Sequence, residues 1–219
     1  KDKVPERFFM EGVSEQSIIG MAAGLALEGY LPFVNTIATF ITRRCFEQIV
    51  LDLCLHDLPV KLIGNGGGLV YASLGPTHQA IEDISILRTL PKMTILAPCD
   101  ANEMRNLIPA TLKWPHPIYI RLSRGDEAII TQKNRKFVIG KSVIIKKPQD
   151  YLFLTTGIAT RITLNASKKL YNEHNVSSGV IHFPTIKPLD TQALTKWIKK
   201  AKKIITVEEN VLTGGFGSS

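Results

Sequence analysis

The chain has 219 residues, of which 44% are hydrophobic and 21% charged, and its formal net charge is +8. This composition is typical of a globular protein with one large domain or two small ones. No apolar run reaches the roughly 18 residues that a membrane span needs, because charged residues interrupt the most hydrophobic stretch at Arg43, Arg44, Glu47 and Asp52. The first residues also lack the apolar core of a signal peptide. We therefore expect a cytoplasmic protein without a membrane span.

The three cysteines, Cys45, Cys54 and Cys99, show no spacing typical of a metal site. Cys45 and Cys54 fall in an apolar helical pattern, and Cys99 follows a predicted strand. A sparse, odd set of this kind indicates buried, reduced thiols, as in a cytoplasmic protein.

The positive charge is densest at residues 196–203. Apolar residues follow helical spacing through this segment, at Leu194, Trp197, Ile198 and Ala201, so the lysines occupy the opposite face. Aromatic residues are few, and no nucleic-acid-binding motif is present. We interpret the lysines as a solvated helix face and expect no nucleic-acid partner.

Along the chain, short apolar and β-branched runs alternate with segments of helical periodicity. This alternation predicts an α/β fold of two doubly wound units, each with a mostly parallel sheet. The predicted strands are residues 33–37, 60–63, 94–97, 118–122, 143–145, 151–155, 179–183 and 204–207. We expect one domain at residues 1–130 and a second at 131–219, joined through a polar stretch at 125–150. No helical pattern follows the last strand, so we expect the second domain to be truncated at its end.

The first predicted helix begins near Ser14, whose hydroxyl is typical of an N-cap, and places Glu15 in its first turn, where the helix dipole favours an acid. The small residues that follow, including Gly20 and Gly24, would let another backbone or a flat ligand approach closely. Taken alone, the segment is most simply a capped helix.

Three further helices are predicted from periodicity and capping residues. The first has an apolar face made by Phe46, Ile49, Val50, Leu53 and Cys54. Asp100 and Glu103 form a capping box at the start of the next, which Pro109 is expected to shorten or kink. Asp190 is expected to cap the last.

Two loop segments contain residue types suited to a site. Glycines fill the segment 64–68 after a predicted strand, but no helix follows directly, so a dinucleotide-type phosphate loop is excluded and a lining for close ligand approach is favoured. In the segment 75–79, Gly75 and Pro76 predict a turn, Thr77 can cap, and His78 is expected at a helix start, where its neutral form is favoured. This segment alone is equally consistent with a surface turn.

Together, these segments resemble the transketolase family. The sequences VSEQ, TFITRRCFEQI, GPTHQAIED, LAPCDANE and RLSRG occur between Arg7 and Arg124 in the order of the family's pyrimidine-binding domain. Farther along, TTG, TIKPLD and VEEN-LTGGFGS resemble the family's C-terminal domain. GPTHQ combined with the upstream glutamate is a specific signature, whereas either alone is not.

The resemblance implies that Glu15 bonds a ring nitrogen of the aminopyrimidine of thiamine diphosphate. By sharing a proton there, the glutamate helps the exocyclic nitrogen to deprotonate the thiazolium carbon, so Glu15 is expected to be buried. The resemblance also implies that Phe40 packs on the pyrimidine, and it groups Arg44 and Phe46 with the cofactor-binding residues. For Phe46, core packing is favoured, because it lies on the apolar helical face.

The resemblance further implies that His78 contacts the cofactor and substrate hydroxyls, and that Arg124 binds a sugar phosphate. A solvated arginine near the domain joint is the alternative for Arg124. Two positions depart from the family pattern: Leu74 replaces an acidic residue that reads a donor hydroxyl, and Gly66 or Asn65 replaces a histidine that helps to bind phosphate. These departures affect the choice of substrate more than the reaction class.

Family members hold the diphosphate through a divalent metal on a Gly-Asp-Gly motif, which this chain lacks; Gly125-Asp126-Glu127 has the wrong context. A hard cation such as Mg²⁺ or Ca²⁺ requires oxygen ligands. The resemblance therefore implies a partner, an N-terminal transketolase subunit with the diphosphate- and metal-binding domain. We expect self-association as well, into a dimer or a heterotetramer.

The function implied is transfer of a two-carbon ketol unit between phosphorylated sugars. Two alternatives stay open. One is a carboligase or decarboxylase subunit like deoxyxylulose-phosphate synthase or the β subunit of a 2-oxo acid dehydrogenase. The other is a non-catalytic scaffold or regulatory subunit that kept the fold.

Overall fold

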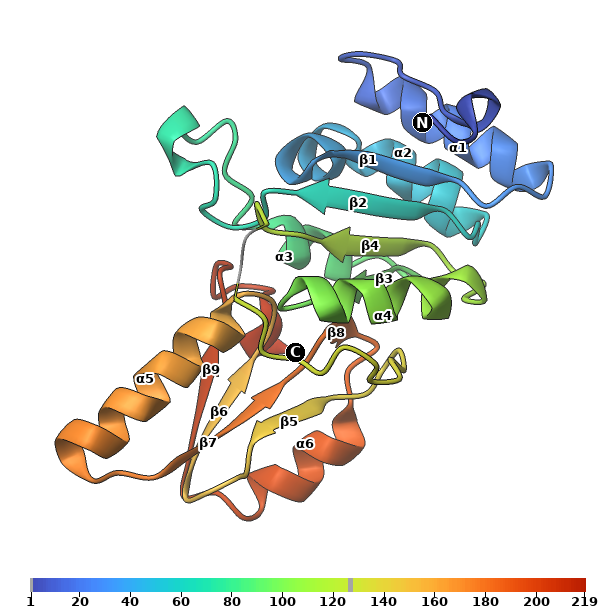
Figure 1. Ribbon diagram of the computed structural model, residues 1–219. Helices are drawn as coiled ribbons and strands as arrows, with labels where there is room; N and C mark the ends of the chain where they lie inside the picture. Colours follow the sequence, from blue (N-terminus) through green and yellow to red (C-terminus); the bar gives the residue numbers. More distant parts are fainter. Residues whose placement is uncertain (1, 126–127) are drawn as a thin grey trace.

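The computed structural model describes residues 2–125 and 128–219, which form two α/β units (Figure 1). The first unit is built on a five-stranded sheet in the order β1-β2-β4-β3-β8, with β1, β2, β3 and β4 parallel and β8 antiparallel to β3. Its strands are β1 (Phe33–Ile37), β2 (Lys61–Asn65), β3 (Thr94–Leu96), β4 (Ile118–Arg121) and β8 (Thr185–Lys187).

Helices cover both faces of this sheet, so its central strands are apolar on both sides. One face packs against α1 (Glu15–Leu27), the segment 40–55 and α3 (Asp83–Arg88). The other packs against α4 (Ala101–Leu112) through Leu107. The segment 40–55 consists of the short helix α2 (Phe46–Gln48) between two π-helical stretches, η2 (Phe40–Arg44) and η3 (Ile49–Leu55).

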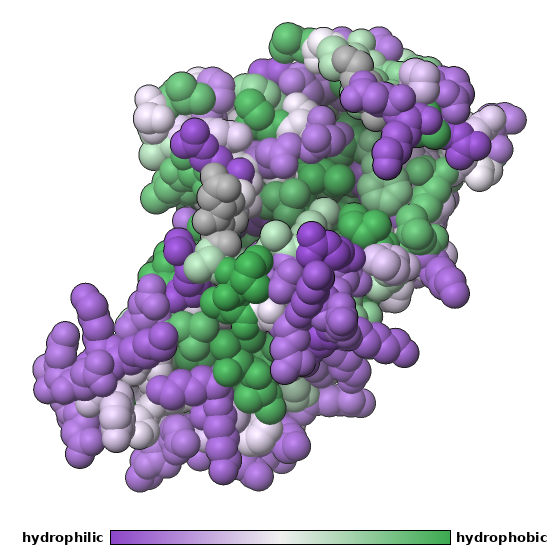
Figure 2. Space-filling model, viewed as in Figure 1, coloured by the Kyte–Doolittle hydropathy of each residue, from purple (hydrophilic) through white to green (hydrophobic). Residues whose placement is uncertain are grey.

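The second unit has a four-stranded sheet in the order β5-β7-β6-β9, in which only β5 runs antiparallel to its neighbour. Its elements are β5 (Val143–Lys146), β6 (Tyr151–Thr155), α5 (Ala159–His174), β7 (Ser178–His182), α6 (Thr191–Ile198) and β9 (Lys203–Val207). Hydrophilic side chains cover α5 and α6 in Figure 2, with apolar side chains between them over the strands. Lys196 lies over the Trp197 ring on α6. This contact and the hydrophilic surface of α6 support the interpretation of the lysines as a solvated helix face.

The predicted fold class and all eight predicted strands are confirmed, with ends within two residues. The additional strand, β8, was not predicted. It is three residues long and lies between Pro184 and Pro188, so it has neither the length nor the alternation that marks a strand. Although it belongs to the second half of the chain, it extends the first sheet by pairing Ile95 with Lys187 and Leu96 with Thr185.

Three short 3₁₀ segments complete the description: η1 (Pro5–Arg7), η4 (Ala72–Leu74) and η5 (Phe216–Ser218). No helix in the described parts of the chain is long and apolar enough to cross a membrane. The three cysteines are buried and free of disulfides in the described structure, as predicted.

Some local predictions are corrected by the structure. The hydroxyl of Ser14 does not cap α1; it donates to the carbonyl of Glu11 at 2.7 Å. Pro109 does not shorten α4, which continues to Leu112. The capping carboxylates are confirmed, because Asp100 accepts from the Glu103 N–H and Asp190 from the Ala193 N–H.

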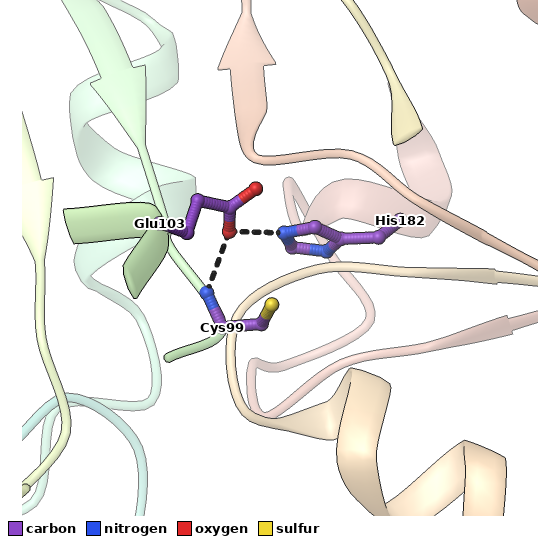
Figure 3. A group of neighbouring side chains, drawn as sticks. All are labelled: Cys99, Glu103 and His182. Carbon is purple, nitrogen blue, oxygen red and sulfur yellow. Dashed lines mark hydrogen bonds and ion pairs between the residues drawn. The ribbon is translucent and has the colours of Figure 1, made fainter. Parts of the chain in front are cut away.

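A buried polar contact joins the two units (Figure 3). Glu103 on α4 accepts a hydrogen bond from Nε2 of His182, the last residue of β7, at 2.7 Å, and a second from the N–H of Cys99 at 2.8 Å. Nδ1 of His182 lies 2.8 Å from the hydroxyl of Thr160. The carboxylate and the ring therefore have hydrogen-bond partners within the protein, which a buried polar contact requires.

Candidate active site

The candidate site lies where parallel strands β1 and β2 end, at the edge where open α/β sheets bind their ligands. After β1 the chain enters η2, and after β2 it enters the glycine segment 64–68 and then the turn 75–79 (Figure 1). The N-terminus of α1 lies against η2 through Glu15 and Arg44. Three separate stretches of sequence thus meet here.

Glu15 is the first residue of α1 and is only 6% exposed. Its carboxylate oxygen Oε2 accepts a hydrogen bond from Nη1 of Arg44 at 2.7 Å. A buried carboxylate needs such a partner, because an unpaired charge removed from water is costly. Burial of Glu15 agrees with the expectation from the sequence.

Three planar side chains form a row that begins at the Glu15 carboxylate: Arg44, then Phe40, then His78. The Arg44 guanidinium lies 4.4 Å from the centroid of the Phe40 ring, a cation–π contact. The His78 ring stands edge-on to the same ring, with 5.1 Å between centroids. Four residues predicted from the sequence are therefore neighbours in the structure.

An open pocket of about 380 Å³ adjoins this row and is lined by Thr39, Phe40, Arg43, Arg44 and Thr77. The polar lining comes from two guanidinium groups and two hydroxyls, and the apolar lining from a phenyl ring. Such a surface suits a flat heterocycle together with an oxygen-rich or anionic group.

Cys45 follows Arg44 and is fully buried. Burial and the nearby charge of Glu15 raise the pKa of its thiol to about 11, against a smaller lowering by Arg44. The thiol is therefore protonated at neutral pH, and a neutral side chain lies beside Glu15.

His78 lies in a turn and not at a helix start, so this part of the prediction is wrong. The next helix along the chain, α3, begins at Asp83. Before it, Ala80 pairs with Gly68 as an isolated antiparallel bridge. The Thr77 hydroxyl lies 2.9 Å from Nδ1 of His78.

The glycine segment packs closely against the protein's own side chains, and its expected ligand-lining role stays a prediction. A Cβ on Gly64 would meet the Tyr119 ring at 2.7 Å, and one on Gly67 would meet the Arg121 side chain at 2.6 Å. Gly66 has a φ of +74° and lies against the Tyr71 ring. The protein's own side chains therefore fill the space beside these glycines.

The remaining predicted residues lie apart from the row. Phe46 is partly buried against the hydrophobic core, which agrees with core packing. Arg124 is exposed beyond the end of β4. Leu74, in η4, is 57% exposed and offers no hydrogen-bonding group. Asp126 and Glu127 lie outside the described residues.

Sequence reasoning missed a buried ion pair beneath the site. Nε of Arg121, on β4, donates to Asp83 at 2.8 Å, and both side chains are almost fully buried. Nη2 of Arg121 donates to the carbonyls of Ala80 and Glu209, at 3.1 and 2.8 Å. A charged residue in an apolar strand was the available signal, since such residues are seldom buried without a partner.

Residues 1–127 match the family model for the transketolase pyrimidine binding domain, and residues 140–219 match that for the transketolase C-terminal domain. The chain belongs to the transketolase family. One curated relative is the 1-deoxy-D-xylulose-5-phosphate synthase of Dictyoglomus turgidum. It is 41% identical to this chain, and the match covers 99% of this chain and 35% of that protein. Another is an apulose-4-phosphate transketolase subunit of Phocaeicola vulgatus, 34% identical over 99% of this chain and 69% of that protein.

A solved structure described as a split gene transketolase, inactive beta4 tetramer, superimposes with a TM-score of 0.91 at 33% identity. The match covers 99% of this chain and 70% of that chain. The chain spans about a third to two thirds of the length of the curated relatives it matches. These transketolase and synthase relatives imply a family that uses thiamine diphosphate.

The site geometry fits the aminopyrimidine of this cofactor. The Arg44 guanidinium is a planar N–C–N group that donates to the buried Glu15 carboxylate while lying on the Phe40 ring. An aminopyrimidine is also planar and carries an N–C–N edge, so these residues offer it one hydrogen-bond acceptor and one stacking face. Glu15 and Phe40 are the residues in this chain that would hold it.

Proposed function

We propose that this chain is the C-terminal subunit of a thiamine-diphosphate-dependent transketolase that moves a two-carbon ketol unit between phosphorylated sugars. The observation that carries the proposal is the buried carboxylate of Glu15, which Arg44 connects to the Phe40 ring and to an open pocket. A buried acid beside an aromatic face is what a pyrimidine with a proton on its ring nitrogen needs. The family match and the relative named as a transketolase subunit support the same reaction class.

In this proposal each side chain has one task. Glu15 holds a proton at the pyrimidine ring nitrogen, and Phe40 fixes the ring plane. His78, which contacts the Phe40 ring, donates to or accepts from a substrate hydroxyl, and Arg124 binds the sugar phosphate. When bound, thiamine diphosphate supplies the electron sink for the carbon–carbon cleavage, while the protein supplies position and electrostatics.

The diphosphate and its metal belong to another part of the assembly. The chain has no Gly-Asp-Gly motif, and a hard cation such as Mg²⁺ or Ca²⁺ requires oxygen ligands. We therefore assign them to an N-terminal transketolase subunit. The similarity to a split gene transketolase, and to relatives that are themselves named as transketolase subunits, supports such a partner.

A second candidate is favoured by one observation, the 41% identity to a 1-deoxy-D-xylulose-5-phosphate synthase. In that case the same site would join pyruvate to an aldose phosphate after decarboxylation. The Glu15, Phe40 and His78 geometry serves either reaction. The two candidates differ only in the donor.

The test is reconstitution of the chain with a diphosphate-binding subunit, Mg²⁺ and thiamine diphosphate. We expect transfer from xylulose 5-phosphate to an aldose phosphate, and no carbon dioxide release from pyruvate. Turnover of pyruvate instead would replace the first candidate by the second. A stable complex that binds no cofactor, as followed by circular dichroism and melting temperature, would indicate a non-catalytic scaffold.

A further inference from the structure

Arg43 and Arg44 are adjacent in η2, yet their side chains contact different parts of the site. Arg44 binds Glu15, whereas Arg43 forms an ion pair with Glu82, Nε to Oε1 at 3.1 Å. A π-helical segment is wider than an α-helix and is frequent at functional sites. This segment turns one arginine toward the acid and the other toward the turn 75–79.

The guanidinium of Arg43 contacts the main chain of that turn at three points. Its Nη2 lies within hydrogen-bond distance of the carbonyl oxygens of Pro76, Thr77 and Gln79, at 3.2, 3.3 and 3.1 Å, and shares its two hydrogens among the acceptors around it. The same nitrogen also donates to the hydroxyl of Thr39. These three carbonyls flank His78 on both sides, so one side chain holds the peptide groups before and after the histidine.

The turn has little backbone support of its own. Within 75–79 the described structure contains one main-chain hydrogen bond, from the His78 N–H to the Gly75 carbonyl at 3.1 Å. Backbone carbonyls without a partner would leave the turn free to change shape. Arg43 supplies a donor group to this turn through Nη2 while its Nε binds Glu82, and an ammonium on a flexible stem does not reproduce this division between two nitrogens of one planar group.

We propose that Arg43 is a positioning residue for His78. It ties the turn to η2, the segment that also carries Phe40, and so sets the 5.1 Å spacing between the His78 and Phe40 rings. Arg43 and Glu82 are partly exposed, with 41% and 29% of their side chains accessible, so the ion pair alone would contribute little. The restraint comes from several contacts converging on one short turn.

The expected effect on substrate binding rests on the proposed function, because it depends on the role of His78. The positioning of His78 by Arg43 does not depend on it. Nuclear magnetic resonance of the imidazole groups in the full 219-residue chain tests the positioning itself, without any activity. The chain has five histidines. We expect Arg43→Ala to shift and broaden the ring signals of His78 alone. Glu82→Gln, which keeps the three carbonyl contacts, should have a smaller effect on the same signals.

Arg43→Lys and Arg105→Ala are the comparison variants. Lysine should restore the His78 signals in part, since it keeps the charge but not the fork of donors. Arg105 is exposed on α4, donates to Asn102, and should leave His78 unchanged when replaced. Unchanged His78 signals in a folded Arg43→Ala chain would overturn the proposal. If Arg43→Ala does not fold, the same result in Arg43→Met, which keeps an apolar stem without a donor, decides.

Kinetics of the reconstituted enzyme provide the second readout. We expect Arg43→Ala to raise the KM for the donor ketose about tenfold or more, because small displacements of a positioned group are costly. The affinity for thiamine diphosphate should fall by less than the KM for the donor rises, since the proposed contacts of the cofactor in this chain are Glu15 and Phe40 and not Arg43 itself. An equal loss of cofactor affinity would overturn the positioning role. If the wild-type chain with its partner subunit does not transfer ketol units, the proposed function is overturned. The imidazole signals would still decide whether Arg43 positions His78.

Discussion

At the scale of single residues, the site is organised by one buried carboxylate and the cations around it. Glu15 is almost completely covered, and its partner Arg44 is shared with the Phe40 ring. Arg43, the next cation, binds the turn that carries His78. A change of one of these side chains should therefore affect one part of the site and leave the sheet intact.

Replacing Glu15 with glutamine tests the role proposed for the acid. The amide has nearly the same shape but cannot hold the transferred proton, so we expect turnover of the reconstituted enzyme to fall by about 10²- to 10⁴-fold. Assembly with the partner subunit should be preserved. Initial rates and sedimentation of the mixture measure the two properties.

Glu47→Gln is the matched control, because Glu47 is exposed on α2 close to the same segment. It should leave turnover unchanged. Normal turnover in the Glu15 variant would remove this residue from the mechanism.

At the scale of elements, the connections between strands and helices are held by buried polar side chains. Lys61 on β2 is fully buried and donates to the carbonyls of Trp114 and His116, at 2.9 and 3.3 Å. These carbonyls belong to the connection between α4 and β4. Burial lowers the pKa of Lys61 to about 8 from its ordinary 10.5.

This pKa predicts how stability depends on pH. Between about pH 8 and 10.5 the unfolded chain binds more protons at Lys61 than the folded chain, so this residue makes folding more favourable as pH rises. We expect the free energy of unfolding of the wild type, relative to Lys61→Met, to increase by about 1 kcal/mol per pH unit in this range. Urea unfolding of both chains at pH 7.5, 8.5 and 9.5 measures the difference. A constant difference would contradict the assigned protonation.

The glycine segment gives a second prediction at this scale. Gly66 and Gly75 both have positive φ, +74° and +82°, but only Gly66 is blocked, by the Tyr71 ring. Alanine at Gly75 should cost about 1 kcal/mol or slightly more for the backbone conformation. Alanine at Gly66 should cost a further 1–3 kcal/mol or so for the overlap with the ring.

Melting temperatures of the two variants compare these costs. Adding Tyr71→Ala should lessen the effect at Gly66 and not at Gly75. Equal destabilisation of both variants would show that the Tyr71 ring does not restrict position 66. Because of the same overlap, any larger side chain at position 66 would require Tyr71 to move.

At the scale of the whole molecule, the two units are joined by buried contacts rather than by the linking chain alone. Strand β8 extends the first sheet from within the second half of the chain, and Glu103 of the first unit binds His182 of the second. Burial by itself would raise the pKa of Glu103, but the His182 ring and the hydrogen bonds from His182 and Cys99 outweigh it and lower the pKa below 4.5.

The sign of the resulting pH dependence follows from this lowering. A carboxyl with a depressed pKa in the folded state adds stability that is complete above its unfolded value and is lost as pH falls through the folded one. We expect the wild type to be more stable than Glu103→Gln at pH 7, with the advantage shrinking below about pH 4.5. Denaturant unfolding of both chains at pH 7, 5 and 4 measures this difference in the free energy of unfolding. An advantage that grows on acidification would contradict the assigned charge on Glu103.

The sequence by itself determined the fold class, the positions of eight strands along the chain and four candidate residues that are neighbours in the structure. Periodicity and capping are local properties, and motifs such as GPTHQ keep their meaning without coordinates. Glu15, Phe40, Arg44 and His78 could therefore be named in advance. Arg124 could be named too, and the roles of all five residues stay predictions.

Only the tertiary structure decided how distant segments meet. It joined β8 to the first sheet, filled the space beside the glycines with Tyr71, Tyr119 and Arg121, and directed Arg43 to the turn that carries His78. The physical reason is that these contacts, apart from that of Tyr71 with Gly66, join residues dozens of positions apart. Side-chain packing and donor–acceptor geometry, which no local pattern encodes, select them.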